Sequence, residues 1–390
     1  MDGAEKAMRQ IRGELYTEAF RFEPGILIIE DDCIMSVKSC GEDELTAEEK
    51  ERYILPGLVD IHFHGCGGYD LCDGTVTALR GMATYELSHG ITSVCPATMT
   101  LPEERLKDIC AVCASAVKTE MVNGEVPLSD ILRGIYLEGP FLSVEKRGAQ
   151  NRKYIQKPDL EMLTGLQKAA GGLIRIVAIA PETEGAMDCI REGREVFCFS
   201  AAHTCADYDT ASAAFEAGVR HVTHLYNAMP PFTHREPGVV GAAAENSGVT
   251  AELICDGIHI HPSVVRSTFK MFGAERLVLI SDSMRAAGME DGIYTLGGQD
   301  VCVKGNLASL SDGTIAGSVT NLYDCMLTAI RMGVSREEAV RAATLNPAAV
   351  IGIDADCGSL QAGKKADILV ADKDFCLREV IKSGITTMIR

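Results

Sequence analysis

The chain has 390 residues, of which 46% are hydrophobic and 24% charged, and its formal net charge is −18. This length suits one large α/β barrel or two to three ordinary domains. The negative charge argues against binding to nucleic acids or to anionic membrane surfaces, although a pocket in an acidic protein can still be locally basic.

Other features of the sequence predict a cytoplasmic protein. No run reaches the roughly 18 apolar residues of a membrane span, and the N-terminus has no apolar signal core. The fifteen cysteines are odd in number and lie in a long chain, which favours reduced thiols over disulfides. Cys110 and Cys113 form a single C-x-x-C pair in a helical pattern, so we expect them to pack rather than to bind zinc.

The first 55 residues look β-rich, with apolar runs at 25–29 and 33–37 separated by an acidic turn. From Leu58 onward, strand-like runs alternate with helical stretches, and eight such alternations predict a (β/α)₈ barrel. A doubly wound sheet is the alternative, but the glycine-rich turn after the first run lacks G-x-G-x-x-G spacing. The predicted barrel strands are Leu58–His64, Ile91–Pro96, Ile131–Glu138, Ile174–Ala180, Val196–His203, His221–Leu225, Thr250–Cys255 and Leu277–Asp282.

The alternation stops after Asp282. Residues 293–318 predict a hairpin-rich insertion, 319–333 and 335–352 predict helices, and 358–384 return to β structure. The segment from Gly358 to Lys364 resembles a phosphate-binding loop, but Lys365 stands where a serine or threonine must follow, so we reject that interpretation. We expect residues 1–55 and 346–390 to meet as a small β-sandwich domain beside a barrel domain formed by residues 56–345.

Histidines and carboxylates fall where the predicted strands end. His62 and His64 are two residues apart, which in a strand places both on one face, although an isolated H-x-H is more often two exposed histidines. In such barrels the chemistry sits at the carboxyl ends of the strands. The other side chains at these ends are Glu138, His203, His224 and Asp282.

Imidazole and carboxylate ligands suit zinc or ferrous iron, and such a site polarises a water molecule. Asp282 is then the candidate general base. Together these side chains predict a metal-assisted hydrolase.

The chain resembles the amidohydrolase superfamily, and within it the enzymes that deacetylate amino sugar phosphates. The motifs that carry the resemblance are PGLVDIHFHG, LEGPF, HLYNAM with REPG, DGIHIHP, and ISDSM with a later AGS. The resemblance implies hydrolysis of the acetamide of N-acetylglucosamine 6-phosphate to glucosamine 6-phosphate and acetate. It also implies a homodimer, in which Arg235 reaches the partner's phosphate site.

The resemblance further implies a role for each matching residue. Glu138, His203 and His224 are the primary metal ligands, Asp282 is the acid/base, and His62 with His64 allow a second metal. At position 150 the family usually has histidine, so the glutamine here puts phosphate affinity or the exact substrate in question. The implied substrate-binding residues are Ala149, Gln150, Asn227, Ala228, Arg235, Asp256, Gly257, Ile258, His259, Ile315, Ala316 and Gly317.

Two other interpretations stay open. A cyclic-amide hydrolase of the same superfamily would have a carboxylated lysine on the fourth strand, where this chain has none. A catalytically inactive scaffold would have lost a ligand or Asp282, and all are present. Of the remaining histidines, His261 is expected to cap a strand, and His221 is assigned no role.

Overall fold

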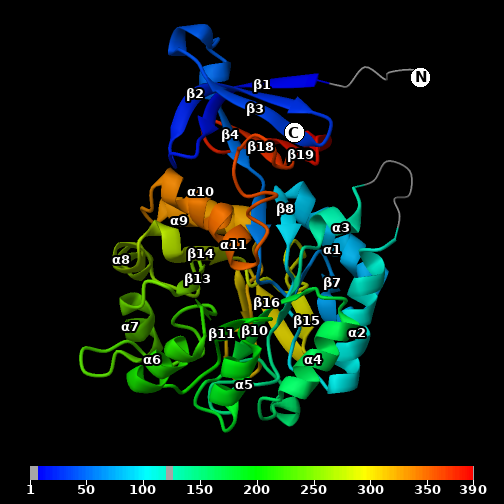
Figure 1. Cartoon of the computed structure of the whole chain (residues 1–390), viewed down its shortest axis with the longest axis vertical. Helices are drawn as coiled ribbons and strands as arrows, with labels where there is room; N and C mark the ends of the chain where they lie inside the picture. The colour runs from blue at the N-terminus through cyan, green and yellow to red at the C-terminus, as the bar shows by residue number, and fades with distance from the viewer. Residues whose placement is uncertain (1–7, 120–125, 390) are drawn as a thin grey trace.

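A computed structural model describes residues 8–119 and 126–389. The first seven residues of the predicted sandwich segment, and residue 390, therefore lie outside the described part of the chain. Figure 1 shows a sheet built from both ends of the chain stacked on one end of an α/β barrel.

The barrel contains all eight predicted strands, each shorter than predicted. Strands β9 to β14 form one parallel sheet in sequential order, and β5 pairs with β8. Parallel bridges from Val94 to Leu132 and from Ala97 to Tyr136 connect these two sheets, and Asp282 N donates to His62 O at 2.9 Å. These contacts close the ring, which confirms the predicted fold. The strands are β5 (Leu58–Asp60), β8 (Ile91–Val94), β9 (Ile135–Leu137), β10 (Ile174–Ile179), β11 (Cys198–Ala201), β12 (His221–Val222), β13 (Thr250–Ile254) and β14 (Leu277–Ile280).

Side chains alternate across the barrel wall, as the period of a strand requires. On β14, Val278 and Ile280 join the cluster inside the barrel, whereas Leu277 and Leu279 join the cluster between strands and helices. The helices are α1 (Val76–Ser88), α2 (Glu103–Ala116), α3 (Leu128–Ile131), α4 (Leu160–Ala169), α5 (Ala186–Gly193), α6 (Tyr208–Ala217), α7 (Gly238–Glu245), α8 (Pro262–Phe272), α9 (Leu322–Arg331), α10 (Arg336–Ala343) and α11 (Leu345–Val350).

Several helices begin at a capping side chain that accepts a hydrogen bond from the first turn. Asp159 caps α4, Asp207 caps α6 and Ser335 caps α10. His261 is the N-cap of α8, so the prediction that it caps a strand was wrong; Pro262 after it starts a helix, as proline at the first helical position often does. Cys110 is buried on α2 with Cys113 in the core, as predicted.

The second body is a seven-stranded sheet in the order β20-β19-β18-β4-β1-β2-β3. Strand β3 forms one edge of the sheet, yet its first residue, Cys33, forms a β-bridge with Lys365, just before β18. The sheet therefore curls around its own apolar core. The predicted meeting of the two chain ends is present, and β1 is a strand that the sequence reading missed. The strands are β1 (Met8–Tyr16), β2 (Phe22–Glu30), β3 (Cys33–Ser39), β4 (Arg52–Pro56), β18 (Ile368–Asp372), β19 (Leu377–Lys382) and β20 (Ile385–Ile389).

The loop that resembles a phosphate-binding loop lies at the edge of this sheet, where Gly363 N donates to Ile34 O on β3 at 2.8 Å. Lys364 is buried, and its Nζ donates to Asp354 O, to Cys357 O and to Ser359 Oγ. The ammonium group therefore serves carbonyl and hydroxyl oxygens of its own segment, which agrees with rejecting a nucleotide-binding role.

The predicted insertion is an antiparallel sheet of β15 (Gly292–Leu296), β16 (Gln299–Lys304) and β17 (Leu307–Ser309). It packs its own apolar cluster, including Val301 and Leu296, against Met284 just beyond β14. The insertion thereby stands beside the carboxyl ends of the strands. In the described ranges, no helix has the length and apolar character needed to cross a membrane.

Candidate metal centre and active site

The candidate ligands lie just beyond the strands rather than within them. His203, His224 and Asp282 have φ values of 42°, 27° and 47°. This left-handed backbone is uncommon for residues other than glycine and costs about 1–3 kcal/mol each, a strain that clusters at functional sites. The backbone leaves the strand direction at these positions, which explains why the observed strands are shorter than predicted.

Glu138, His203 and His224 form one compact group. Glu138 Oε1 lies 3.1 Å from His203 Nε2 and 3.1 Å from His224 Nε2, and the two imidazole nitrogens are 3.2 Å apart. All three side chains are buried. Two nitrogens and a carboxylate oxygen converging on one point are the donor set of a divalent cation site.

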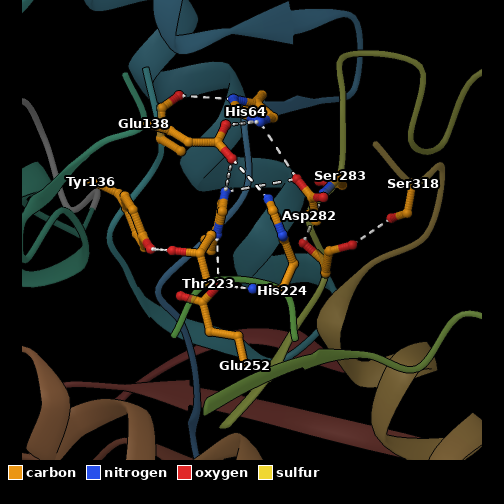
Figure 2. Close-up of polar contacts among 12 residues, drawn as sticks. His64, Tyr136, Glu138, Thr223, His224, Glu252, Asp282, Ser283 and Ser318 are labelled. Atoms are coloured by element: carbon orange, nitrogen blue, oxygen red, sulfur yellow. Dashed lines mark hydrogen bonds and ion pairs between the residues drawn. The ribbon is translucent and has the colours of Figure 1, made fainter. Parts of the chain in front are cut away.

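His62, His64 and Asp282 form a second group whose ligand atoms lie within 4.8 Å of one another. His64 Nε2 is 3.1 Å from Glu138 Oε2 and 3.4 Å from Asp282 Oδ1, and Figure 2 shows these three side chains pointing toward one another. Strand β5 ends at Asp60, so His62 and His64 converge through the turn after the strand rather than through strand alternation. The predicted convergence is present for a different reason.

The electrostatics of the two groups fit a bound cation. Burial opposes protonation of His62, but the Glu252 and Glu138 carboxylates outweigh burial and raise its pKa. Burial would raise the pKa of Glu138, but His62, His203 and His224 outweigh it and hold that pKa below its usual range. His62 Nε2 is buried with no hydrogen-bond partner among the described residues. Buried carboxylates that stabilise positive charge, next to an imidazole nitrogen without a hydrogen-bond partner, suit a divalent cation.

Glu252 on β13 is a site residue that the sequence reading missed. It is fully buried, and it accepts hydrogen bonds from His62 Nδ1 at 2.8 Å, from His221 Nε2 at 2.9 Å and from the backbone of His224 at 2.9 Å. A carboxylate that holds a ligand's other ring nitrogen fixes the imidazole's tautomer and orientation. A charged residue inside the apolar run Thr250–Ile254 was the signal available in the sequence.

A cavity of about 400 Å³ opens over these groups, within the size range of small-molecule sites. His64, Glu138, His203, His224 and Asp282 line it directly, whereas His62 lies beneath. Of the predicted substrate-binding residues, those on its wall are Ala149, Gln150, Asn227, Ala228, His259, Ile315 and Gly317.

The other predicted substrate-binding residues are not on this wall. Asp256 stands behind His259 and accepts from its Nδ1 at 2.7 Å, with Gly257 and Ile258 in the same turn. Ala316 is buried between its wall-lining neighbours. Arg235 lies in the exposed segment 231–236 and does not reach the cavity of its own chain, so its role stays a prediction.

Two cationic side chains on the cavity wall escaped the sequence reading. Lys146 and Arg147 precede Gly148 in the loop after β9. Neither forms an ion pair in the described part of the chain; Lys146 Nζ donates to Met229 O and Arg147 to Val144 O. Of the described residues, Glu145 and Asp312 line the same wall, but neither forms an ion pair with the two cations, so their positive charge is available to a ligand. Only the fold brings this charge to the metal groups.

Fold and donor groups together define a metal-dependent hydrolase built on a (β/α)₈ barrel. Residues 53–388 match the model of the Amidohydrolase family, and the chain belongs to that family. It is 37% identical, over 366 residues that cover 92% of each chain, to an N-acetylglucosamine-6-phosphate deacetylase of Bacillus subtilis (strain 168). It is 33% identical to an N-acetylgalactosamine-6-phosphate deacetylase of Escherichia coli O157:H7, covering 86% of this chain and 88% of that one.

The fold is also similar to that of a solved relative. An N-acetyl-D-glucosamine-6-phosphate deacetylase mutant from Mycobacterium smegmatis, in complex with N-acetyl-D-glucosamine 6-phosphate, superposes with a TM-score of 0.90. The two are 32% identical, and the match covers 98% of this chain and 100% of the other.

Proposed function

We propose that this chain hydrolyses the acetamide of N-acetylglucosamine 6-phosphate, releasing acetate and glucosamine 6-phosphate. The observation that carries this proposal is one carboxylate, Glu138, shared by two histidine groups, with Asp282 beside it on the wall of a small cavity. Relatives that are named for this reaction match the chain over most of its length.

The proposed chemistry places a divalent cation, zinc or ferrous iron, in the group of Glu138, His203 and His224, and a second in that of His62, His64 and Asp282. When bound, such a cation acts as a Lewis acid toward water and the amide carbonyl. The ligand residues hold the reacting groups in one place.

Asp282 performs the proton transfers. Burial opposes its ionisation, but His64 and His62 outweigh burial and lower its pKa, so the carboxylate is ionised at neutral pH. It takes a proton from the attacking water and later gives that proton to the amine nitrogen as the C–N bond breaks. His259 lines the cavity and its Nδ1 donates to Asp256, whose carboxylate outweighs burial and raises the pKa of His259. In its protonated form, His259 also has an Nε2–H that can donate to a substrate oxygen.

The phosphate requires cationic partners. Lys146 and Arg147 supply them from the same chain, and Arg235 supplies a third from a partner subunit in the homodimer that we propose. A guanidinium group pairs with phosphate through two parallel hydrogen bonds. The enzyme acts on a metabolite and is proposed to work in the cytoplasm.

The main alternative substrate is the galactosamine epimer, because one relative carries that name. A cyclic-amide hydrolase that uses a carboxylated lysine is disfavoured, since β10 reads IRIVAI and contains no lysine. An inactive scaffold is disfavoured because both groups and Asp282 are intact.

Acetate release, measured with a panel of N-acetylated hexosamine 6-phosphates and their unphosphorylated forms, tests the proposal. We expect the highest kcat/KM for N-acetylglucosamine 6-phosphate and a large loss without the phosphate. A preference for the galactosamine epimer would change the assigned substrate to that epimer. If metal-loaded protein released no acetate from any sugar of the panel, the proposed function would be overturned.

A further inference from the structure

Gln150 lies on the cavity wall and is hydrogen-bonded to the metal groups. Its side chain is 3% exposed and lies between two fixed partners. Its Nε2 donates to Glu138 Oε2 at 2.7 Å, and its Oε1 accepts from the backbone N–H of Thr100 at 2.7 Å. Both ends of the amide are therefore engaged, which leaves little of it for a substrate.

The backbone N–H of Thr100 determines the orientation of the Gln150 side-chain amide. A backbone N–H can only donate, so it takes the amide oxygen and turns the NH₂ group toward Glu138. Glu138 Oε2 is the acceptor in this hydrogen bond. Gln150 thus holds one oxygen of the carboxylate that both histidine groups share.

The hydrogen bond reaches only one of the two carboxylate oxygens. Oε1 lies 3.1 Å from His203 Nε2 and His224 Nε2 and 3.5 Å from His62 Nε2. Oε2 lies 3.1 Å from His64 Nε2 and accepts from Gln150 Nε2. Because Gln150 holds Oε2, it fixes the rotation of the carboxylate about its last bond. Without that restraint, Oε2 is free to turn away from His64 while Oε1 stays beside His203 and His224.

We propose that Gln150 is a positioning residue that holds Glu138 in a bridging orientation and so selectively supports a cation at the group of His62, His64 and Asp282. The inference rests on the proposed metal centre. Residues that orient a metal ligand typically contribute 10- to 100-fold in metal affinity, so a similar loss is expected at this group alone.

The test is a zinc titration of chelator-treated protein by calorimetry, with metal content checked by elemental analysis. Gln150→Met keeps the length of the side chain and removes both hydrogen bonds. We expect wild type to bind two cations, and the variant to lose at least tenfold in affinity at one group while the other changes little. Gln150→Asn, which is too short to reach both partners, should shift affinity in the same direction if Gln150→Met fails to fold.

Gln167→Met is the matched control. Gln167 also makes two hydrogen bonds, both to the backbone of Ile174, but lies on α4 away from the metal groups. This variant should bind two cations as wild type does. Absorption spectra of cobalt-loaded protein add a readout independent of turnover, because loss of the cation at one group removes one set of bands.

Several outcomes overturn the inference. These are wild-type affinity at both groups in Gln150→Met, equal losses at both groups, or a wild-type protein that binds one cation. The last result, accompanied by acetate release, would leave the proposed function intact, whereas no cation binding and no acetate release would overturn the proposed function as well.

Discussion

At the scale of single residues, the site depends on side chains held where the strand direction is broken. Asp282 combines a strained backbone, burial and two imidazole neighbours within 4 Å. Its carboxylate belongs to the group with His62 and His64, and it lines the cavity. Backbone strain of this kind clusters at functional sites, which supports a chemical role for the Asp282 carboxylate.

We therefore expect Asp282→Asn to keep the fold and substrate binding while losing most of its turnover. An asparagine is nearly the same size but can neither accept the water proton nor return it. The loss should be about 10² to 10⁴ in kcat, or roughly 3 to 5 kcal/mol of barrier. The acidic limb of the wild-type rate–pH profile, caused by protonation of this carboxylate, should disappear. Retention of more than about a tenth of the turnover, well inside that range, would assign the base to another residue.

Arg147 carries the prediction for phosphate recognition. We expect Arg147→Ala to raise KM for the phosphorylated substrate by about 10- to 100-fold, since hydrogen bonds to charged groups contribute about 1.5–3 kcal/mol. Rates with the unphosphorylated sugar should not change. Arg191→Ala is the control, because Arg191 is an exposed arginine on α5 paired with Asp188. An equal loss with both sugars would point to a structural role for Arg147 instead.

At the scale of elements, the pattern of strands and helices was predictable, and so was the convergence of most candidate ligands. Alternating apolar runs predict barrel strands because the buried wall requires them, and His203, His224 and Asp282 follow from the rule that strand ends hold the chemistry. Glu252 and Gln150 were not assigned to the metal centre, because their roles depend on partners 190 and 12 residues away. Strand β1 was missed because polar and charged residues interrupt its apolar alternation.

Strand β13 presents Glu252 to His62, to His221 and to the backbone of His224. We expect Glu252→Gln to weaken metal binding by about 10- to 100-fold, because the amide offers one acceptor oxygen to three donors. Metal content after dialysis measures this loss. Glu245→Gln on α7, whose carboxylate accepts from Tyr208 at the surface, is the control. Full metal content in Glu252→Gln would show that the histidines orient themselves without it.

Helix α1 carries a second buried carboxyl group, with a consequence for stability. Glu86 is 0% exposed, and neither of its oxygens has a hydrogen-bond partner among the described residues. Burial, and then the charge of Asp60, raises the pKa of Glu86 to about 8. The folded state therefore holds this proton more tightly than the unfolded state, whose pKa is about 4.5.

A raised carboxyl pKa means that stability is highest below the unfolded pKa and falls as pH rises toward the folded pKa. Glu86→Gln removes this titration and should raise the melting temperature relative to wild type more at pH 8 than at pH 5. Glu104→Gln, an exposed glutamate on α2, should show no such trend. A mutant-minus-wild-type difference that does not change with pH would contradict a protonated Glu86.

At the scale of the whole molecule, Arg235 lies away from the cavity of its own chain. It projects in an exposed segment with Phe232, which is 50% exposed. An arginine that serves a neighbouring subunit's cavity would occupy such a place in a single chain. This interpretation requires the homodimer that the family resemblance predicts.

Mixed dimers test it. Arg235→Ala and Asp282→Asn should each be nearly inactive alone. Unfolded and refolded together, they should recover about a quarter of wild-type activity, since half the dimers are mixed and each has one complete site of two. Sedimentation should give a dimer throughout. No recovery from verified mixed dimers would place Arg235 in its own subunit's function, and a fully active monomer would contradict the dimer itself.

The curled sheet pairs a strand that is synthesised early with strands that are synthesised last. Strand β4 ends at Pro56 and its partner β18 begins at Ile368. A ribosome adds about 5–20 residues per second, so the edge of β4 waits roughly 15 to 60 seconds for that partner. During this time its unpaired backbone is open to other nascent chains. The delay makes the N-terminal strands the part of the nascent chain that most needs a chaperone, and faster translation of residues 57–367 should increase the soluble yield.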